Sequence, residues 1–358
     1  MMNQDRYQRQ ITLAGFGIEG QQKLQEAKVL VVGAGGLGIP VLNYLNAMGV
    51  GTLGVVDADV VSLSNLHRQV LFTEAMVGIS KVEAVKSQLS AQNSSTEIRT
   101  YHTFLTVDNA LEIIEGYDLV VDATDNFPTR YLINDACVIL NKPFVYGALH
   151  AFEGQVSVFN YKGGPTYRCL YPTMPAADAV PNCNENGVLG ILPGIIGNLQ
   201  ALEAIKIITD LGEVLTGILL LCDTLTQRTQ RIRFKLQPGH NEIKVLEKSY
   251  EFSCDLPLKS IEANALQQLL SEGAIELLDV RTSKEYQRQH IDQVKHIPLS
   301  ELADRSSELN LEETVYVICQ SGVRSKKAIA KLQELYPGKD FVNVVGGMNQ
   351  MKNYVDTY

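Results

Sequence analysis

A glycine-rich turn near the start of the chain has the residue types and spacing of a phosphate-binding loop. Gly33, Gly35 and Gly38 follow the G-x-G-x-x-G pattern, after an apolar strand expected at residues 29–32 and before an amphipathic helix. Glycines let the backbone approach a phosphate closely, and the start of the helix adds free N–H groups and a partial positive charge. Asp57 ends the next expected strand, where a carboxylate can hold a ribose hydroxyl. The pattern predicts a nucleotide site and leaves open whether the nucleotide is ATP or a nicotinamide dinucleotide.

Basic side chains around this turn favour ATP. Arg68 and Lys81 follow Asp57 in the sequence, and Arg9 lies near the N-terminus. Three cations at one site suit a triphosphate and a departing pyrophosphate better than a redox dinucleotide. Any one of them alone could be an ordinary solvated charge, so the prediction rests on their joint occurrence.

An acidic residue follows a third expected strand, at 119–121. Asp125 would stand at the carboxyl end of this strand, which is a suitable position for a Mg²⁺ ligand. Asn126 comes next, and the pair could instead cap the helix that follows. Both interpretations stay open at this point.

A cysteine in the last part of the chain has the setting of a nucleophile. Cys319 closes an apolar strand expected at 315–319, and a short loop leads from it into a helix. The loop comprises Gln320, Ser321, Gly322, Val323 and Arg324. The inward-pointing N–H groups of such a loop and the positive end of the helix both stabilise a thiolate or a persulfide anion. We therefore predict a nucleophilic Cys319, against the alternative of a buried strand-end cysteine.

A second candidate nucleophile is Cys183. It lies in a polar, turn-rich stretch ahead of a glycine-punctuated helix expected to start near Ile195. An exposed cysteine near the start of a helix can form a thiolate easily and attack an electrophile. The alternative is an inert loop cysteine.

Two α/β domains are expected to position these residues. The first two thirds of the chain alternate apolar strands with amphipathic helices, which is typical of a mostly parallel, Rossmann-like sheet covered by helices. A polar linker at 246–257 separates this domain, 1–245, from a smaller α/β domain at 258–358. The elements expected in the smaller domain are helices at 260–272 and 324–336 and strands at 275–280, 315–319 and 341–345.

Composition bounds the classes of function. The chain has 358 residues and a net charge of −9, which disfavours a general nucleic-acid binder because phosphate contact needs a cationic surface. Its 6 cysteines are spread thinly, with no secretory leader ahead of them, which favours reduced thiols in the cytoplasm. The most apolar run, 218–222, is too short to span a bilayer, so we expect no membrane segment.

The motifs between residues 5 and about 235, with the glycine-rich stretch at 187–194, resemble one enzyme family. It comprises the adenylyltransferases that activate ubiquitin-like sulfur carriers for molybdopterin synthase and thiamine biosynthesis, relatives of ubiquitin-activating enzymes. The resemblance implies that the C-terminal Gly-Gly carboxylate of a carrier attacks the α-phosphate of ATP and becomes an acyl-adenylate. The residues that it assigns to the nucleotide are Gly33, Gly35, Gly36, Gly38, Asp57, Ser64, Asn65, Arg68, Lys81, Asp125 and Asn126. Asp125 would carry Mg²⁺, and Arg9 would act as an arginine finger supplied by the partner subunit of a homodimer.

Two cysteine features concern this resemblance. Cys183 matches a position that can bond covalently to the activated carrier or to a sulfur partner. Many relatives also hold a structural Zn²⁺ with two C-x-x-C pairs. Here Thr166 stands where the first cysteine of the first pair would be, ahead of Cys169. The second pair would fall between Cys222 and Cys254, where the sequence has no cysteine, so we predict no zinc.

Residues 259–358 resemble a rhodanese domain, in which the loop cysteine, here Cys319, accepts sulfane sulfur as a persulfide. Asp279, Arg281 and Glu285 are expected to form ion pairs and turns rather than to catalyse. Gln320 stands where such domains often have a cation. Loss of that cation would weaken a small-anion donor more than a protein persulfide donor such as a cysteine desulfurase.

Together the two domains predict an enzyme that adenylates a sulfur carrier ending in Gly-Gly and then supplies sulfur from Cys319 to give a thiocarboxylate. Cys183 or a second reductant would resolve the intermediate. One alternative is an activator that passes on a ubiquitin-like modifier as a thioester of Cys183, with the rhodanese domain as a docking module. The other is an NAD-dependent oxidoreductase that shares only the glycine loop. The sequence does not distinguish the molybdopterin from the thiamine pathway.

Overall fold

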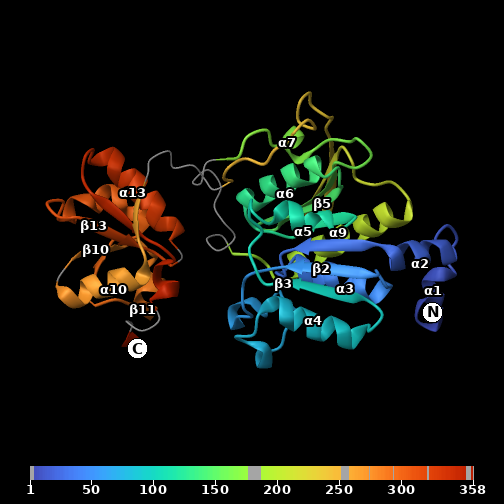
Figure 1. Cartoon of the computed structure of the whole chain (residues 1–358), viewed down its shortest axis with the longest axis horizontal. Helices are drawn as coiled ribbons and strands as arrows, with labels where there is room; N and C mark the ends of the chain where they lie inside the picture. Colours follow the sequence, from blue (N-terminus) through green and yellow to red (C-terminus); the bar gives the residue numbers. More distant parts are fainter. Residues whose placement is uncertain are drawn as a thin grey trace. The chain divides into compact units, whose positions relative to one another are not determined.

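The computed structural model describes residues 4–175, 187–250, 258–273, 275–292, 294–320, 322–351 and 356–357. The chain divides into two compact units, Met1–Glu251 and Phe252–Tyr358. Each unit is a sheet with helices packed on it (Figure 1).

The first unit is built on a sheet of 8 strands in the order β3-β2-β1-β4-β5-β6-β7-β8. The strands are β1 (Lys28–Val32), β2 (Thr52–Val56), β3 (Glu97–Tyr101), β4 (Leu119–Asp122), β5 (Phe144–His150), β6 (Glu153–Phe159), β7 (Ile218–Asp223) and β8 (Arg228–Arg233). The strands from β3 to β5 pair in parallel, and those from β5 to β8 pair antiparallel. The mostly parallel, Rossmann-like sheet is therefore as expected from the sequence.

Helices cover both faces of this sheet. They are α1 (Gln4–Ile11), α2 (Gly17–Glu26), α3 (Gly38–Met48), α4 (Lys81–Gln92), α5 (Ala110–Glu115), α6 (Phe127–Ile139), α7 (Tyr167–Leu170) and α9 (Ile191–Thr209). In β1, Val29 and Val31 join the core under α3, α4 and α9, whereas Leu30 and Val32 join the core under α5 and α6. This alternation explains the continuous apolar run of the strand, because both of its faces are buried.

Helix α9 begins at Ile191, earlier than the expected start near Ile195. Pro193 stands in its first turn, where a missing N–H costs nothing. Among the described residues α9 is the one helix long and apolar enough to cross a membrane by composition. Half of it is buried, and it packs against α3, β5 and β6, as the core helix of a folded domain does.

The second unit has a parallel sheet of 5 strands in the order β12-β10-β13-β14-β9. The strands are β9 (Lys259–Ile261), β10 (Glu276–Asp279), β12 (Lys295–His296), β13 (Val315–Ile318) and β14 (Phe341–Val344). The helices are α10 (Ala263–Glu272), α11 (Ser283–Arg288), α12 (Leu302–Arg305) and α13 (Val323–Leu335), and β11 (Gln289–His290) pairs with β15 (Asp356–Thr357). The expected helix at 260–272 is wrong at its start. Residues 259–261 pair with β14 as an edge strand, and the helix begins at Ala263.

The end of the first unit reaches further than the sequence suggests. The Tyr250 hydroxyl donates to Asp135 Oδ2 at 2.6 Å, and the side chain is buried at 4 % exposure. Leu246 packs on the same core. Residues 246–250, the first part of the expected linker, therefore belong to the first unit, and residues 251–257 lie outside the described residues.

Candidate functional site

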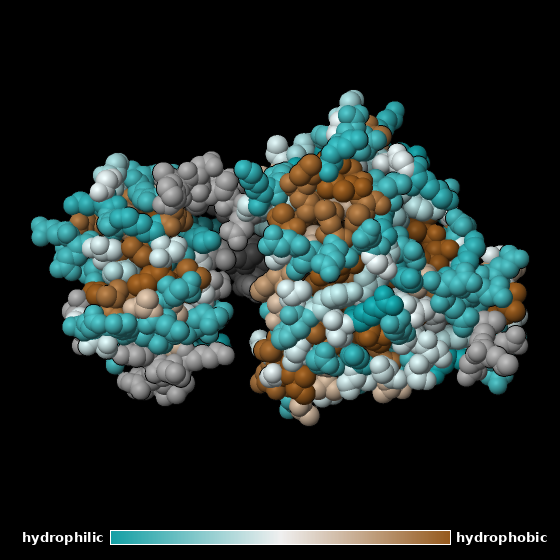
Figure 2. All heavy atoms as spheres, in the orientation of Figure 1, coloured by the Kyte–Doolittle hydropathy of each residue, from teal (hydrophilic) through white to brown (hydrophobic). Residues whose placement is uncertain are grey.

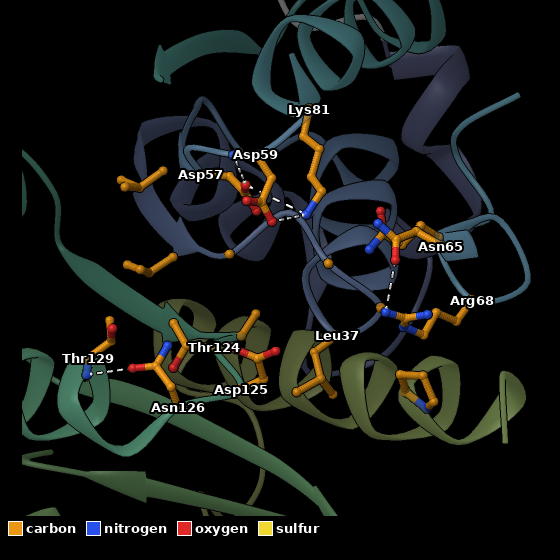
Figure 3. Close-up of a pocket in the computed structure, with 18 of the residues that line it drawn as sticks. Leu37, Asp57, Asp59, Asn65, Arg68, Lys81, Thr124, Asp125, Asn126 and Thr129 are labelled. Atoms are coloured by element: carbon orange, nitrogen blue, oxygen red, sulfur yellow. Dashed lines mark hydrogen bonds and ion pairs between the residues drawn. The ribbon is translucent and has the colours of Figure 1, made fainter. Parts of the chain in front are cut away.

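A cavity of about 590 Å³ opens in the first unit beside the glycine-rich turn, at the carboxyl ends of β1, β2 and β4. Parallel α/β sheets bind ligands at this edge. Figure 3 shows Asp57, Asp59 and Lys81 grouped on one side, Asn65 and Arg68 on another, and the turn that carries Thr124 to Asn126 on a third.

The glycine turn is built by close backbone packing. Gly33 has a φ of +99°, and a Cβ there would lie 2.7 Å from the carbonyl oxygen of Ala123. A Cβ on Gly38 would lie 1.9 Å from the carbonyl oxygen of Gly33. Gly33, Gly35 and Gly36 line the cavity, whereas Gly38 is not among its described lining residues and serves the packing of α3 on the turn. Gly35, Gly36 and Leu37 lead into α3 and line the cavity, so a ligand there would lie beside the positive end of this helix.

Asp57 holds this turn in place. Its two carboxylate oxygens accept from the backbone N–H groups of Ala34 and Asp59, each at 2.8 Å. Each oxygen keeps a second lone pair, so the carboxylate can still accept from a ribose hydroxyl, and that role remains a prediction.

Lys81 is the first residue of α4 and is buried at 4 % exposure. Its Nζ lies 2.8 Å from Asp59 Oδ2 and 3.7 Å from Asp57 Oδ1. Sequence reasoning missed Asp59. The signal was its place two residues after Asp57, but its pairing with Lys81 becomes visible only once the end of β2 and the start of α4 are brought together.

Arg68 is held between two neighbours at the other end of the cavity. Its Nη2 donates to Asn65 Oδ1 at 3.1 Å, and its Nη1 lies 2.7 Å from His67 Nε2. Since a guanidinium only donates, the His67 nitrogen is the acceptor in this contact. Ser64 is not among the described lining residues, and its hydroxyl contacts Ser62 Oγ at 3.0 Å.

Asp125 and Asn126 lie in the turn between β4 and α6, and both line the cavity. Asn126 is the N-cap of α6 and accepts from the Thr129 N–H at 2.9 Å, which is the capping alternative considered above. Asp125 lines the cavity with an exposed side chain. Asp125 is thus the carboxylate of this turn that is available to a ligand.

A buried ion pair lies under this turn and was not predicted. The side chains of Asp122 and Arg130 are 0 % and 9 % exposed, and Asp122 Oδ2 lies 3.9 Å from Arg130 Nε. Asp122 Oδ1 accepts from the N–H and the hydroxyl of Thr124, at 3.0 and 2.6 Å. Burial raises the pKa of the Asp122 carboxyl, and the hydrogen bonds and the nearby guanidinium oppose that shift.

Arg9 and Cys183 were also predicted as site residues, and neither is among the described residues that line this cavity. Arg9 lies exposed on α1 and is not among the described lining residues. Cys183 lies outside the described residues.

The second unit presents Cys319 at the end of β13, with a fully buried side chain. Its Sγ accepts from the Gly322 N–H at 3.1 Å and lies 3.5 Å from Ser325 Oγ. Gly322 has a φ of +89°, a left-handed conformation that favours glycine, and α13 starts at the next residue, Val323. Backbone N–H donation and the positive end of α13 both stabilise negative charge on this sulfur. Ser321 lies outside the described residues.

The charged residues around this loop have structural partners. Arg324 makes a bidentate ion pair with Glu285 at 2.6 and 2.7 Å, and this pair lowers the pKa of Glu285 to about 2. Arg281 pairs with Asp279 at 2.6 Å, both almost fully buried. Gln320 donates to Asn349 Oδ1 at 2.7 Å. The expectation that Asp279, Arg281 and Glu285 form ion pairs and turns agrees with these contacts.

Cys169, where one C-x-x-C pair was sought, is held by hydrogen bonds. Its Sγ accepts from the N–H groups of Thr166 and Gln237 at 3.4 and 3.3 Å. Over the described ranges no group of three or more His, Cys, Asp or Glu side chains could hold a metal ion. Hydrogen bonds to the Cys169 sulfur thus connect the segment around Thr166 with the segment around Gln237.

Comparisons with known proteins agree on two regions. Residues 7–242 match the ThiF family, and residues 262–354 match the rhodanese-like domain. The chain is 41% identical to the adenylyltransferase and sulfurtransferase MOCS3 of Anopheles gambiae over an alignment of 385 positions, which covers 98% of this chain and 87% of that relative. It is likewise 41% identical to MOCS3-1 of Zea mays, over 98% of this chain and 82% of the relative.

Solved structures support the fold of the first unit. The structure of E. coli MccB with ATP superposes with a TM-score of 0.57 at 22% identity, over 65% of this chain and 73% of that chain. The Microcin C7 biosynthetic enzyme MccB in complex with N-formylated MccA gives a TM-score of 0.60, also at 22% identity, over 66% of this chain and 74% of that chain. At this identity the likeness shows the fold alone.

Proposed function

This chain belongs to the ThiF family and carries a rhodanese-like domain, and we propose that it adenylates the C-terminal carboxylate of a ubiquitin-like sulfur carrier and then transfers sulfur to it. One observation carries the proposal: a cavity beside a glycine-rich turn and a cysteine that accepts a backbone N–H in its loop occur in one chain that is 41% identical, over 98% of its length, to relatives named for both activities. Family membership also removes the NAD-dependent oxidoreductase from consideration.

In the adenylation step a carboxylate oxygen of the carrier bonds to the α-phosphorus of ATP, and the bond from that phosphorus to pyrophosphate breaks. Negative charge grows on the phosphates and on the departing pyrophosphate. Arg68 and Lys81 both line the cavity at separate places and supply positive charge there (Figure 3). Gly35 and Gly36 line the cavity just before α3, so backbone N–H groups at the start of this helix would add fixed donors that need little rearrangement.

Mg²⁺ belongs to the proposal because the donor set fits it. Mg²⁺ typically takes one or two protein carboxylates and completes its shell with phosphate oxygens and water. Asp125 offers such a carboxylate in the lining of the cavity, while Asp59 already pairs with Lys81 at 2.8 Å. Bound there with ATP, the ion would neutralise charge on the phosphates.

In the sulfur step the terminal sulfur of a Cys319 persulfide attacks the acyl carbonyl, and AMP leaves with the bonding electron pair. The product is an acyl disulfide between the carrier and Cys319. A thiolate, of Cys183 or of another reductant, then attacks the Cys319 sulfur and releases the carrier thiocarboxylate. The resulting disulfide needs two electrons from an external thiol to close the cycle. A protein persulfide donor such as a cysteine desulfurase would reload Cys319.

Phe104 is a further candidate residue, for the adenine base. It lines the cavity from the loop after β3, with a side chain 70 % exposed, although its backbone is fixed by Asn109, which donates to the Phe104 carbonyl oxygen at 2.9 Å. β1 carries the phosphate loop, β2 leads to Asp57, and β3 is the next strand outward. A base beyond the ribose would reach this loop.

We expect Phe104→Ala to raise the KM for ATP about tenfold with little change in kcat, since stacking on an aromatic ring stabilises a base by roughly 1–3 kcal/mol. Steady-state pyrophosphate release checks this. Phe152→Ala is the control, because Phe152 is an exposed phenylalanine that does not line the cavity. An unchanged KM in Phe104→Ala would place the base elsewhere.

A homodimer is the second part of the proposal. Helix α9 exposes an apolar stripe of Ile191, Ile195 and Leu202 along one face. Figure 2 shows that apolar patches also interrupt the hydrophilic surface of the first unit. A second copy is the occupant we propose for the α9 stripe, since Arg9 does not line the cavity of its own chain among the described residues and would be supplied in trans.

Mixing two inactive variants tests this arrangement. Arg9→Ala and Asp125→Ala homodimers should each be inactive, whereas a mixed dimer has one site with both residues intact. Random exchange of subunits should therefore restore about a quarter of the wild-type rate. Lys81→Ala mixed with Asp125→Ala should stay inactive, because both residues lie in the same chain's site. Failure of the first mixture to recover would mean that Arg9 does not act across a dimer.

The direct test of the function is ATP–pyrophosphate exchange with purified protein, Mg²⁺ and a panel of carriers that end in Gly-Gly. Exchange with one carrier would establish adenylation and indicate whether the molybdopterin or the thiamine pathway is served. A hydroxylamine-sensitive adduct on Cys183 without sulfur incorporation would support a thioester-forming activator instead. We place the reaction in the cytoplasm, where thiols stay reduced.

A further inference from the structure

We propose that Arg130 is a positioning residue for adenylation, which fixes the backbone of the turn at 123–126 and thereby the direction of Asp125. This inference rests on the proposed function, because it assigns Asp125 the task of holding Mg²⁺–ATP. Arg130 itself does not line the cavity among the described residues.

Three sets of contacts fix the turn from below. The Arg130 Nη2 donates to the carbonyl oxygen of Thr124 at 3.0 Å. Asp122 Oδ1 accepts from the Thr124 N–H and from its hydroxyl, at 3.0 and 2.6 Å. The carbonyl oxygen of Ala123 lies against Gly33, where any Cβ would come within 2.7 Å. The peptide groups on both sides of Thr124 are therefore held, and Asp125 is the next residue.

The Arg130 guanidinium is itself held by two aromatic rings and a carboxylate. Its central carbon lies 5.5 Å from the centre of the Phe127 ring and 5.4 Å from that of Tyr146. Its Nε faces Asp122 Oδ2 at 3.9 Å, and both of these atoms are buried without a hydrogen-bond partner. A buried ion pair with unsatisfied atoms is a poor source of stability. The arrangement is better explained by what it orders, which is the Thr124 carbonyl.

Lysine should not replace Arg130 at this position. The guanidinium is flat and rigid, so one nitrogen reaches Thr124 while another faces Asp122. An ammonium group keeps the charge but has a single centre, so it cannot keep both contacts in the same geometry. Arg130→Lys is thus a variant that retains the charge and loses the fixed turn.

The matched control is Arg168→Lys. Arg168 also pairs with a carboxylate of α6, at 2.8 and 2.7 Å from the two oxygens of Asp135, and lies 4.9 Å from the centre of the Tyr131 ring. It does not contact the turn at 123–126 in any hydrogen bond of the described chain. The two variants therefore make the same chemical change at guanidinium groups that both pair with a carboxylate, Arg130 on α6 and Arg168 on α7, and one of them alone disturbs Asp125.

The first measurement is amide hydrogen exchange of the whole chain without ATP. In Arg130→Lys the peptide covering residues 122–126 should exchange about tenfold faster, while peptides of α4 and α9 keep their wild-type rates. Arg168→Lys should leave residues 122–126 unchanged. Equal exchange of this peptide in wild type and Arg130→Lys would overturn the proposal.

The second measurement is the binding of ATP by calorimetry over a series of Mg²⁺ concentrations, with the exchange reaction followed in parallel. Arg130→Lys should need about tenfold more Mg²⁺ for half-maximal binding, since a misplacement near 1 Å is costly. Binding without Mg²⁺ should not change. A lower melting temperature with an unchanged Mg²⁺ requirement would mean that Arg130 only stabilises the fold, and the proposal would be wrong.

Two precautions keep the outcomes distinct. If Arg130→Lys does not fold, Thr124→Val loosens the same turn by removing the hydroxyl bond to Asp122 and should give the same two effects in smaller measure. If the wild-type chain shows no exchange with any carrier, the proposed function fails. Hydrogen exchange at residues 122–126 still decides whether Arg130 holds the turn.

Discussion

Replacing Cys319 by serine should abolish thiocarboxylate formation while leaving ATP–pyrophosphate exchange at the wild-type rate. Serine keeps the size of the side chain but cannot carry a sulfane sulfur, so transfer should fall by at least about a thousandfold. Cys319 lies in the second unit, in the loop that donates the Gly322 N–H, while the residues of the cavity all belong to the first. The two half-reactions should therefore separate cleanly in this variant.

Mass spectrometry of the carrier checks both halves, since an oxygen-to-sulfur exchange adds a defined mass to its C-terminus. The control is Cys169→Ser, which changes a partly exposed cysteine of the first unit and should still yield thiocarboxylate. A Cys319→Ser chain that makes thiocarboxylate at full rate from a persulfide donor would remove the sulfur half of the proposal.

Replacing Asp125 by asparagine should reduce ATP–pyrophosphate exchange by about a hundredfold or more, because the lost charge weakens the hold on Mg²⁺–ATP. The shape of the side chain is kept, so the turn itself should remain folded. The deficit should shrink as Mg²⁺ is raised, which a general defect in folding would not do.

The matched control for Asp125 is Asp108→Asn. Asp108 is an exposed aspartate of the same unit, near the loop that carries Phe104, and it does not line the cavity among the described residues. Its replacement removes one negative charge without touching the site. Wild-type exchange in Asp125→Asn at limiting Mg²⁺ would show that another group holds the ion.

The parts of the site that sequence could predict are those carried by contiguous residues. The glycine turn is such a part, because its spacing, the strand before it and the helix after it all lie within one short stretch. The Cys319 loop is another, since strand, cysteine, glycine and helix follow one another directly. In both, local geometry creates the N–H donors, so no distant residue needs to be known.

The parts that sequence could not predict depend on partners that are distant in the chain. Lys81 was predicted as a phosphate ligand, but its pairing with Asp59 needs the start of α4 to lie beside the end of β2. Arg324 was assigned to the loop after Cys319, but its bidentate contact with Glu285 spans 39 positions of the sequence. A charge in the sequence has many possible partners, and burial and packing select among them.

The error at residues 260–261 has the same origin. Ser260 and Ile261 have no strong preference, and the helical pattern of the following residues made them look like its first turn. Pairing with Val342 to Val344 of β14 decides their conformation. Tertiary contacts override weak local propensity at such an edge.

The anchoring of Tyr250 on Asp135 sets the length of the tether between the two catalytic units. From Tyr250 to the next described residue, Leu258, the chain can span at most about 28 Å even when fully extended. A partner confined to a radius of that size has an effective concentration in the millimolar range. Under the proposed function, this tethering would favour sulfur transfer from the second unit over transfer from a free donor in solution. Lengthening the tether would lower this advantage gradually rather than abolish it.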